Sequence, residues 1–335
     1  MTRVTVMGAG SWGTVFAKVL VDAGCDVVLW GRRSEVVQDV NERHENTEYL
    51  PGVRLPEGLR ATTDLVGALA GAEFVCLAVP AQTLRENLAA WAPHIPSDAV
   101  LVSLMKGIES GTTLRMSEVI AEVLGAGPER IGVVCGPNLA MEIARGEPGA
   151  AVAACADERT AQRLQATCMT PYFRVYTSTD VIGCELGGAV KNVIALCVGI
   201  ATGLGFGDST KALLMTRGLA EITRLGVGLG AQEPTFAGLA GLGDLVATCS
   251  SPYSRNRTFG ENLGRGMTLE EVIAVTKQTA EGVKSSRPVL TMARRHFVEM
   301  PITEVVAAVM HDGVPIEEAY LKLMTRSPKP ERYGV

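Results

Sequence analysis

A short apolar run followed at once by a glycine-rich turn opens the chain. Residues 4–7 have the composition of a buried strand, and a Gly-x-Gly-x-x-Gly spacing follows at Gly8, Gly10 and Gly13. Apolar residues then recur at helical spacing up to Gly24, a residue type that often ends helices. A second strand-like run lies at residues 27–30. This order of strand, turn, helix and strand predicts the start of a doubly wound α/β domain.

The three glycines have different expected roles in such a turn. The first allows the tight turn, the second lets the backbone approach a pyrophosphate, and the third lets the helix pack closely on the strand. The N-terminus of the helix then faces the anion with its free backbone N–H groups. We therefore predict a dinucleotide site here. The alternative is a glycine-rich turn that binds no ligand.

The carboxylate that usually binds the ribose 2′-hydroxyl is missing after the second strand. The chain reads Trp30-Gly31-Arg32-Arg33 at that place. An acidic residue would repel a 2′-phosphate, whereas an arginine can pair with it. Arg32 and Arg33 therefore favour NADP(H), or the use of both NADP(H) and NAD(H). The alternative is that one or both arginines only face solvent.

Further short apolar runs alternate with helical stretches through the first half of the chain. Continuous apolar runs are typical of strands buried on both faces of a parallel sheet. We therefore predict a Rossmann domain over residues 1–180, with a helix at 112–124. The additional predicted strands are residues 74–79, 100–104, 131–135, 150–153 and 172–176.

The pattern changes to that of an all-α domain over residues 181–335. Apolar residues at positions 212, 215, 219 and 222 are spaced as on one face of a helix. Residues 268–271 match a capping box, and a proline at 315 is typical of a helix start. The fold class is therefore α/β, with an N-terminal Rossmann domain and a C-terminal helical domain.

Composition and charge exclude several classes of function. The net charge of −5 gives no basic surface for nucleic acid, and the four histidines lack the spacing of metal ligands. The eight cysteines include no Cys-x-x-Cys pair and fit reduced thiols better than a disulfide framework. No leader precedes the first strand, and the longest uncharged apolar run, residues 192–207, is short for a membrane span. We expect a cytoplasmic protein that binds no nucleic acid or metal and has no membrane span.

Lys191 is the single charge on an apolar face of a segment that is predicted to be helical. Residues three and four positions away on the same face are Gly187, Gly188, Ile194 and Ala195. A lysine on such a face is desolvated, which lowers its pKa toward values that suit proton transfer. We therefore predict that Lys191 is a general acid/base. The alternative is a lysine at a helix edge that extends its ammonium to solvent.

Other polar residues lie where an open parallel sheet binds its ligands, beyond the carboxyl ends of the strands. Lys106 follows the predicted fourth strand, and Gly136 and Asn138 follow the fifth. In the helical half, Asp244 is the only charge in the glycine-rich stretch 238–245. The alternatives are a surface lysine in a loop for Lys106 and a helix N-cap for Asp244.

The run Ser254-Arg255-Asn256-Arg257 combines hydroxyl, guanidinium and amide groups. Together with backbone N–H groups, if a helix starts there, these groups suit a phosphate or carboxylate. We predict a small anionic substrate held by Arg255, Asn256 and Ser254. Its reacting carbon is expected near Lys191 and Lys106. The alternative is a polar loop.

Seven stretches in the same order show that the chain resembles bacterial NAD(P)-dependent sn-glycerol-3-phosphate dehydrogenases over nearly its whole length. The stretches are residues 8–14, 105–107, 136–137, 185–192, 238–245, 254–257 and 281–282.

This resemblance implies the reversible reduction of dihydroxyacetone phosphate to sn-glycerol 3-phosphate, a precursor of phospholipids. It implies that Lys191 is the general acid/base, and that Asp244 and Asn192 help to set its surroundings. The implied substrate contacts are Lys106, Gly136, Asn138, Lys191, Asn192, Asp244, Ser254, Arg255 and Asn256. The implied cofactor contacts are Gly8, Gly10, Ser11, Trp12, Gly13, Arg32, Arg33, Tyr49, Lys106, Ala140, Arg255 and Glu281.

One departure from the family pattern and two alternatives stay open. The position of Asn138 often carries Ser or Thr in the family, which leaves the contact of its side chain open. A related dehydrogenase of the 6-phosphogluconate group would also combine a Rossmann domain, helices and a lysine base. A regulator that binds NADP(H) without turnover is the third reading, although such a protein has no need of a desolvated base. The oligomeric state is open, and a homodimer is one of the options.

Overall fold

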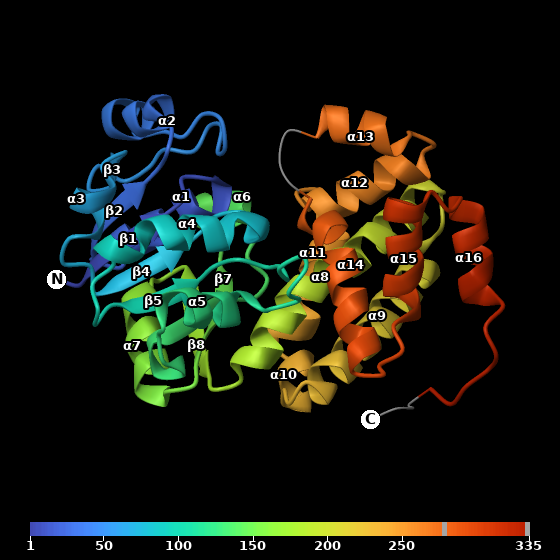
Figure 1. The fold of residues 1–335 in the computed structure, drawn as a ribbon. Coiled ribbons are helices and arrows are strands. Elements are labelled where there is room, and N and C mark those ends of the chain that lie inside the picture. The colour runs from blue at the N-terminus through green and yellow to red at the C-terminus, as the bar shows by residue number, and fades with distance from the viewer. Residues whose placement is uncertain (277–279, 332–335) are drawn as a thin grey trace. The chain divides into compact units, whose positions relative to one another are not determined.

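The computed structural model describes residues 1–276 and 280–331, which form two compact units (Figure 1). The first unit contains Met1–Met105 and Met116–Val181, and the second contains Lys106–Arg115 and Ile182–Val335. The short segment Lys106–Arg115 thus leaves the first unit and packs with the second. Sequence analysis placed this segment inside the first domain and did not separate it.

The first unit is built on a sheet in which the described strands follow the order β3-β2-β1-β4-β5-β6-β7-β8. Val6 in β1 pairs with Leu29 in β2 on one side and with Cys76 in β4 on the other. The strands are β1 Arg3–Met7, β2 Asp26–Trp30, β3 Arg60–Thr62, β4 Phe74–Leu77, β5 Val100–Ser103, β6 Ile131–Cys135, β7 Gly149–Cys155 and β8 Phe173–Ser178. The α-helices of this unit are α1 Ser11–Asp22, α2 Ser34–Gln38, α3 Leu65–Leu69, α4 Leu84–Trp91, α5 Met116–Leu124, α6 Ala140–Ala144 and α7 Glu158–Cys168.

The prediction of a doubly wound domain is confirmed, with several local differences. The short strand β3 was not among the predicted strands. β7 is antiparallel to β6, because the connection 136–148 returns the chain to the sheet from the same edge without a full crossover. The helix predicted from residue 112 begins at Met116 instead. Gly111 and Thr113 have positive φ angles of 88° and 65°, which are incompatible with a right-handed helix.

The core of the first unit follows from the alternation read in the sequence. Phe16 and Leu20 of α1 are fully buried in the same cluster as Leu29 of β2 and Phe74 of β4. Full burial of a side chain of this size contributes roughly 1.5–3 kcal/mol to folding. This packing fixes the start of α1, and therefore the glycine-rich turn, against the sheet.

The second unit is helical, as predicted. Its long helix α8 spans Val181–Gly203, and every residue from Gly183 to Ala201 is buried. By length and composition α8 could cross a membrane, but 89% of its most apolar window is buried inside the protein, which is the behaviour of a core helix. The other α-helices are α9 Asp208–Gly228, α10 Glu233–Ala237, α11 Asp244–Ser250, α12 Arg255–Gly264, α13 Leu269–Val275, α14 Glu281–Arg295, α15 Pro301–Asp312 and α16 Ile316–Met324.

Helices α8 and α12 cross at glycines. A Cβ atom on Gly199 or Gly203 would lie 2.1 or 2.2 Å from a carbonyl oxygen of α12, and one on Gly260 or Gly264 would lie 2.1 or 2.2 Å from a carbonyl oxygen of α8. No side chain larger than glycine fits these four positions without moving a backbone. The two helices are therefore in direct main-chain contact.

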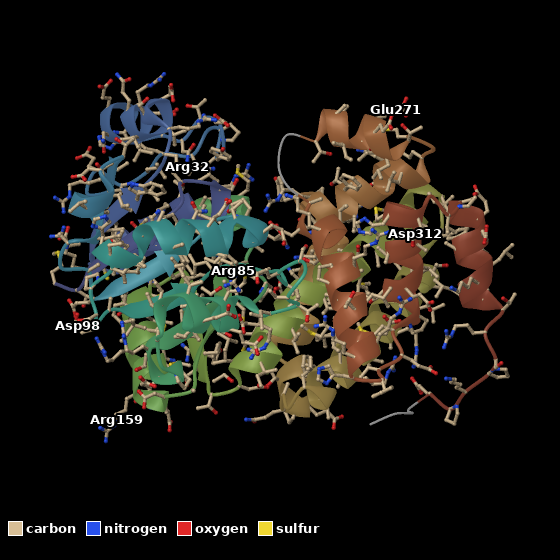
Figure 2. All side chains as sticks on the ribbon, viewed as in Figure 1. Arg32, Arg85, Asp98, Arg159, Glu271 and Asp312 are labelled. Atoms are coloured by element: carbon tan, nitrogen blue, oxygen red, sulfur yellow. The ribbon has the colours of Figure 1, made fainter. Side chains whose placement is uncertain are left out.

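The capping box predicted at residues 268–271 is confirmed at the start of α13. The Thr268 hydroxyl accepts a hydrogen bond from the backbone N–H of Glu271, and the Glu271 carboxylate accepts one from the backbone N–H of Thr268. Glu271 is labelled in Figure 2. This exchange satisfies two N–H groups that would lack a partner within the helix.

Candidate active site

Lys191 lies inside the helical unit with only 5% of its surface exposed. Burial lowers the pKa of its ammonium to about 8, because a charged group loses hydration energy in an apolar environment. The negative charge of Asp244 opposes this shift, and the positive charge of Lys106 adds to it. The alternative of a lysine extended to solvent at a helix edge is wrong, since the ammonium ends inside the protein.

Asp244 stands between two lysines. Its Oδ1 accepts a hydrogen bond from Lys191 Nζ at 2.5 Å, and its Oδ2 accepts one from Lys106 Nζ at 2.7 Å. The carboxylate is 1% exposed and belongs to the first residue of α11, so it is not the N-cap of that helix. Two cations and one anion meet here, which leaves one positive charge to act on a ligand.

Thr248 is a residue of this cluster that sequence reasoning missed. Lys191 Nζ donates a hydrogen bond to its hydroxyl, and that hydroxyl lies 3.4 Å from Asp244 Oδ1. The signal was the spacing: Thr248 is four residues after Asp244, so both side chains lie on one face of α11. A hydroxyl beside a buried ammonium helps to fix the direction of its protons.

The glycines next to Lys191 explain how its partners come so close. A Cβ atom on Gly187 would lie 2.3 Å from the carbonyl oxygen of Ala240, in the π-helical turn Leu239–Gly243 that leads into Asp244. A Cβ atom on Gly188 would lie 3.3 Å from Cγ of Lys106. Because α8 has no side chain at these two glycines, the turn that carries Asp244 and the side chain of Lys106 can both come close to Lys191.

A chain of side-chain amides joins the elements around this cluster. Asn192 Nδ2 donates to the backbone carbonyl of Lys106 at 3.3 Å, and Asn256 Nδ2 donates to Asn192 Oδ1 at 3.0 Å. The backbone N–H of Gly282 donates to Asn256 Oδ1 at 2.9 Å. The two asparagines predicted as substrate contacts are thus brought together, and they hold α8, α12 and α14 in register.

A helix does begin at Arg255, so the alternative of a polar loop is wrong. Ser254 is the N-cap of α12, and its hydroxyl accepts from the backbone N–H of Arg257 at 3.2 Å. Arg255 is the first residue of the helix, whereas Arg257 pairs with Glu261 at 3.2 Å. The helix N-terminus and the Arg255 guanidinium together suit an anion.

The glycine-rich turn of the first unit has the geometry that a pyrophosphate needs. Gly8 has a φ angle of 125°, and a Cβ atom there would lie 2.4 Å from the carbonyl oxygen of Ala78. A Cβ atom on Gly13 would lie 2.0 Å from the carbonyl oxygen of Gly8, whereas the space beside Gly10 is open. Because α1 begins at Ser11, its N-terminus faces that open space, and the residues present fit a dinucleotide.

Arg32 and Arg33 follow β2 and are both exposed (Figure 2 labels Arg32). Arg33 forms a bidentate ion pair with Glu48 and lies over the ring of Tyr49, with 6.0 Å between the guanidinium carbon and the ring centre. The hydroxyl of Ser11 donates to the backbone carbonyl of Tyr49 at 3.0 Å. This loop is therefore tied to the start of α1. Arg32 is the better candidate for a 2′-phosphate, since Glu48 already neutralises Arg33.

The remaining candidates of the first unit follow β6. Gly136 has a φ angle of 125°, and Ala140 is the first residue of α6. Both polar side-chain atoms of Asn138 are buried, and they have no hydrogen-bond partner among the residues that the structure describes. Polar atoms in this condition normally have a ligand or water as their partner. Trp12 Nε1 is in the same condition.

Comparison with known proteins assigns the chain to a family. The model of the N-terminal part of NAD-dependent glycerol-3-phosphate dehydrogenase matches residues 3–161, and the model of the C-terminal part matches residues 180–321. The chain belongs to this dehydrogenase family. The resemblance inferred from the seven sequence stretches is thereby confirmed, and the 6-phosphogluconate group and a non-catalytic regulator are set aside.

Relatives in this family match the chain over its full length. The glycerol-3-phosphate dehydrogenase (NAD(P)+) of Thermobifida fusca is 66% identical, with 100% of both chains covered. The solved glycerol-3-phosphate dehydrogenase of Coxiella burnetii has a TM-score of 0.92 at 37% identity, and the match covers 97% of this chain and 99% of that one. The enzyme of Saccharomyces cerevisiae has a TM-score of 0.81 at 28% identity, covering 96% and 99%.

Within residues 1–276 and 280–331, no group of three or more His, Cys, Asp or Glu side chains is arranged to hold a metal ion. As a dehydrogenase of this family, the chain uses NAD or NADP.

Proposed function

We propose that this dehydrogenase reduces dihydroxyacetone phosphate to sn-glycerol 3-phosphate with Lys191 as its general acid/base. The observation that carries the proposal is a buried lysine, with a pKa of about 8, that shares one carboxylate with a second lysine. A group whose pKa lies near the working pH is effective in both directions of proton transfer.

Lys191 supplies the proton in the reduction. The nicotinamide, when bound, supplies a hydride to the carbonyl carbon of the substrate. As negative charge develops on the carbonyl oxygen, protonated Lys191 donates its proton to that oxygen and becomes neutral. In the oxidation, neutral Lys191 removes the proton from the hydroxyl of glycerol 3-phosphate.

Asp244 and Lys106 set the charge around this proton transfer. The carboxylate keeps enough of Lys191 protonated for the reduction, while Lys106 and burial keep it acidic enough to release the proton. The positive charge of Lys106 stabilises the developing alkoxide. Thr248 holds the Lys191 ammonium in a fixed direction through its hydroxyl.

Arg255 is the proposed partner of the substrate phosphate. Arg255 is the first residue of α12, where helix dipole and backbone N–H groups also favour an anion. Burial of its guanidinium lowers the pKa of Arg255, and the negative charge of Glu281 opposes this shift. Ser254 and Asn256 flank it, and their present hydrogen bonds hold the first turn of α12 in place. Gly136 and Asn138 are proposed as further substrate contacts, which agrees with the unpartnered buried atoms of Asn138.

The dinucleotide is proposed to bind along the turn at Gly10, with Ser11, Trp12 and Tyr49 beside it and Arg32 at the ribose. Ala140, Arg255 and Glu281 complete the proposed contacts. NADP(H) and NAD(H) are both accepted in this proposal. The glycerol 3-phosphate formed would supply phospholipid synthesis in the cytoplasm. The mechanism requires no membrane, nucleic acid or second subunit, and a homodimer is compatible with it.

The test is to follow the absorbance of NADPH in the presence of the purified protein and dihydroxyacetone phosphate. We expect oxidation of NADPH that depends on the phosphorylated substrate, and a product that the same enzyme oxidises again with NADP+. The control is unphosphorylated dihydroxyacetone, which lacks the anionic group. Equal rates with both compounds, or no NADPH oxidation with either, would overturn the proposal.

A further inference from the structure

One stripe of helix α8 contacts both ends of the segment Lys106–Arg115, which we name the lysine loop. Glu185, Gly188 and Asn192 are spaced three and four residues apart, so they lie on the same face of α8. Asn192 donates to the backbone carbonyl of Lys106, and the aliphatic stem of Lys106 lies over the bare backbone of Gly188. These two contacts hold the start of the loop.

The end of the loop is held by an ion pair at the other end of the stripe. Arg115 Nη1 lies 2.6 Å from Glu185 Oε2, and the exposed fractions of the two side chains are 13% and 3%. By contrast, the pair between Arg287 and Asp312 has fractions of 58% and 55%, and Figure 2 labels Asp312. The two pairs therefore differ in the amount of hydration that each has lost.

The loop is closed on itself, so a movement at its end reaches its start. Ile108 forms a β-bridge with Arg115, and the backbone N–H of Glu109 donates to the carbonyl of Leu114 at 2.9 Å. Ile108 is fully buried in the hydrophobic core of the helical unit. It lies two residues after Lys106, so the ion pair, the bridge and Lys106 form one connected unit.

We propose that Arg115 and Glu185 are positioning residues that hold Lys106 against Asp244. The proposal rests on the proposed function and deepens it, because it names what fixes the second lysine of the site. Neither residue contacts the reacting atoms. They act through the loop, and the carboxylate of Glu185 determines where the loop ends on α8.

A role in stability alone is the weaker explanation of this buried pair. Taking two charges out of water costs much of what their attraction gains, so a buried ion pair is poor evidence for added stability. What such a pair does supply is a defined geometry, since a guanidinium and a carboxylate bind each other in few orientations. A defined geometry is what the ammonium of Lys106 needs to stay at one oxygen of Asp244.

Displacement of Lys106 has a measurable electrostatic consequence. The positive charge of Lys106 lowers the pKa of Lys191, so moving that charge away raises the pKa of Lys191. A smaller share of Lys191 is then neutral at a given pH. Because oxidation of glycerol 3-phosphate needs neutral Lys191, the rising limb of its pH–rate profile moves to higher pH. A change in stability alone does not move this limb.

The experiment compares Glu185→Gln and Arg115→Lys with Asp312→Asn as the control at the exposed pair. We expect Glu185→Gln to lower kcat by about 10- to 100-fold, as a small misplacement of a catalytic group does. Its KM for NADPH should be unchanged and its pH–rate limb should move to higher pH. Arg115→Lys keeps the positive charge beside Glu185, so its loss of kcat should be smaller than that of Glu185→Gln. Asp312→Asn should match the wild type in both measurements.

A mutant cycle separates positioning from folding. In a Lys106→Met background, Glu185→Gln should cause almost no further loss of kcat and no further shift of the limb, since the residue through which it acts is gone. Additive losses in this cycle would overturn the proposal. If Glu185→Gln fails to fold, a double variant takes its place in the cycle. The double variant carries Arg115→Met and Glu185→Leu, and so removes both charges of the pair.

The outcome also separates this proposal from the proposed function. If Lys191→Met keeps its activity, the general acid/base assignment is wrong. If Lys191→Met is inactive while Glu185→Gln or the double variant shows wild-type kcat and pH dependence, only the positioning role is wrong.

Discussion

Lys191 and Asp244 are joined by a hydrogen bond of 2.5 Å between Nζ and Oδ1 inside a helical core. The same carboxylate binds Lys106 through its other oxygen at 2.7 Å. One negative charge therefore compensates two positive ones only in part. In the proposed mechanism, the remaining positive charge would stabilise the alkoxide that forms on the substrate during reduction.

Replacement of Lys191 by methionine should remove the proton donor and leave the fold intact, because methionine has a similar length and suits the apolar face of α8. The loss of a general acid lowers kcat by ~10²–10⁴-fold. Steady-state kinetics together with the binding of NADPH would check this. Lys322→Met is the control, since Lys322 is an exposed lysine that pairs with Glu304 on the surface. A kcat for Lys191→Met within a few-fold of the wild type would rule out the assignment.

The two directions of the reaction should depend oppositely on pH. Burial lowers the pKa of Lys191 to about 8, so the protonated form predominates below that pH and the neutral form above it. Reduction needs the protonated form, and its kcat/KM should fall as the pH rises through about 8. Oxidation needs the neutral form, and its kcat/KM should rise over the same interval.

Asp244→Asn provides a second check of this pH dependence. Asp244 favours the charged form of Lys191, so its neutralisation should lower the pKa of Lys191 further and move both limbs to lower pH. The pH dependence of kcat/KM in the variant measures the shift, because kcat/KM reports groups of the free enzyme. Limbs that stay in place would show that another group controls them.

Arg32 and Arg33 should favour NADPH over NADH or make the two comparable. The double variant with alanine at both positions should raise KM for NADPH more than KM for NADH, because only NADPH carries a 2′-phosphate. Among the single variants, Arg32→Ala should have the larger effect, since Arg33 is already paired with Glu48. An equal rise in both KM values would mean that these arginines do not contact the 2′-phosphate.

Arg255→Lys should impair turnover although it keeps the charge. A guanidinium can grip a phosphate through two donors in a fixed orientation, whereas an ammonium cannot. The comparison is kcat/KM for dihydroxyacetone phosphate against unphosphorylated dihydroxyacetone. The wild type should prefer the phosphorylated compound by several orders of magnitude, because binding energy at the phosphate lowers the barrier at the carbonyl.

The variant Arg255→Lys should lose much of that preference. If it keeps the whole preference, the phosphate binds elsewhere. Arg257, which now pairs with Glu261, would then be the next candidate.

Local patterns predicted a large part of the fold and the burial of Lys191. The strand, glycine turn and helix at the start of the chain are encoded within a few residues, so their spacing was sufficient. The desolvation of Lys191 could be predicted for the same reason, since its apolar neighbours are one helical turn away. The start of α12 at Arg255 was considered from the sequence only as a condition for anion binding, and the structure shows that a helix does begin there.

The contacts that define the site could not be predicted in this way. Lys191 meets Thr248 across 57 positions, and Arg115 meets Glu185 across 70. Partners this far apart depend on how helices pack, and sequence spacing carries no information about that. The antiparallel direction of β7 and the late start of α5 depend likewise on turns with special backbone geometry.

The main-chain contact at Gly199, Gly203, Gly260 and Gly264 has a consequence for substrate size. Lys191 is on α8 and Arg255 is on α12, so the proposed proton donor and the proposed phosphate partner belong to two helices whose backbones are in direct contact. The distance between these two backbones is therefore fixed and does not change with side-chain rotamers. In this enzyme, discrimination between a three-carbon and a four-carbon phosphate would be a property of the backbone.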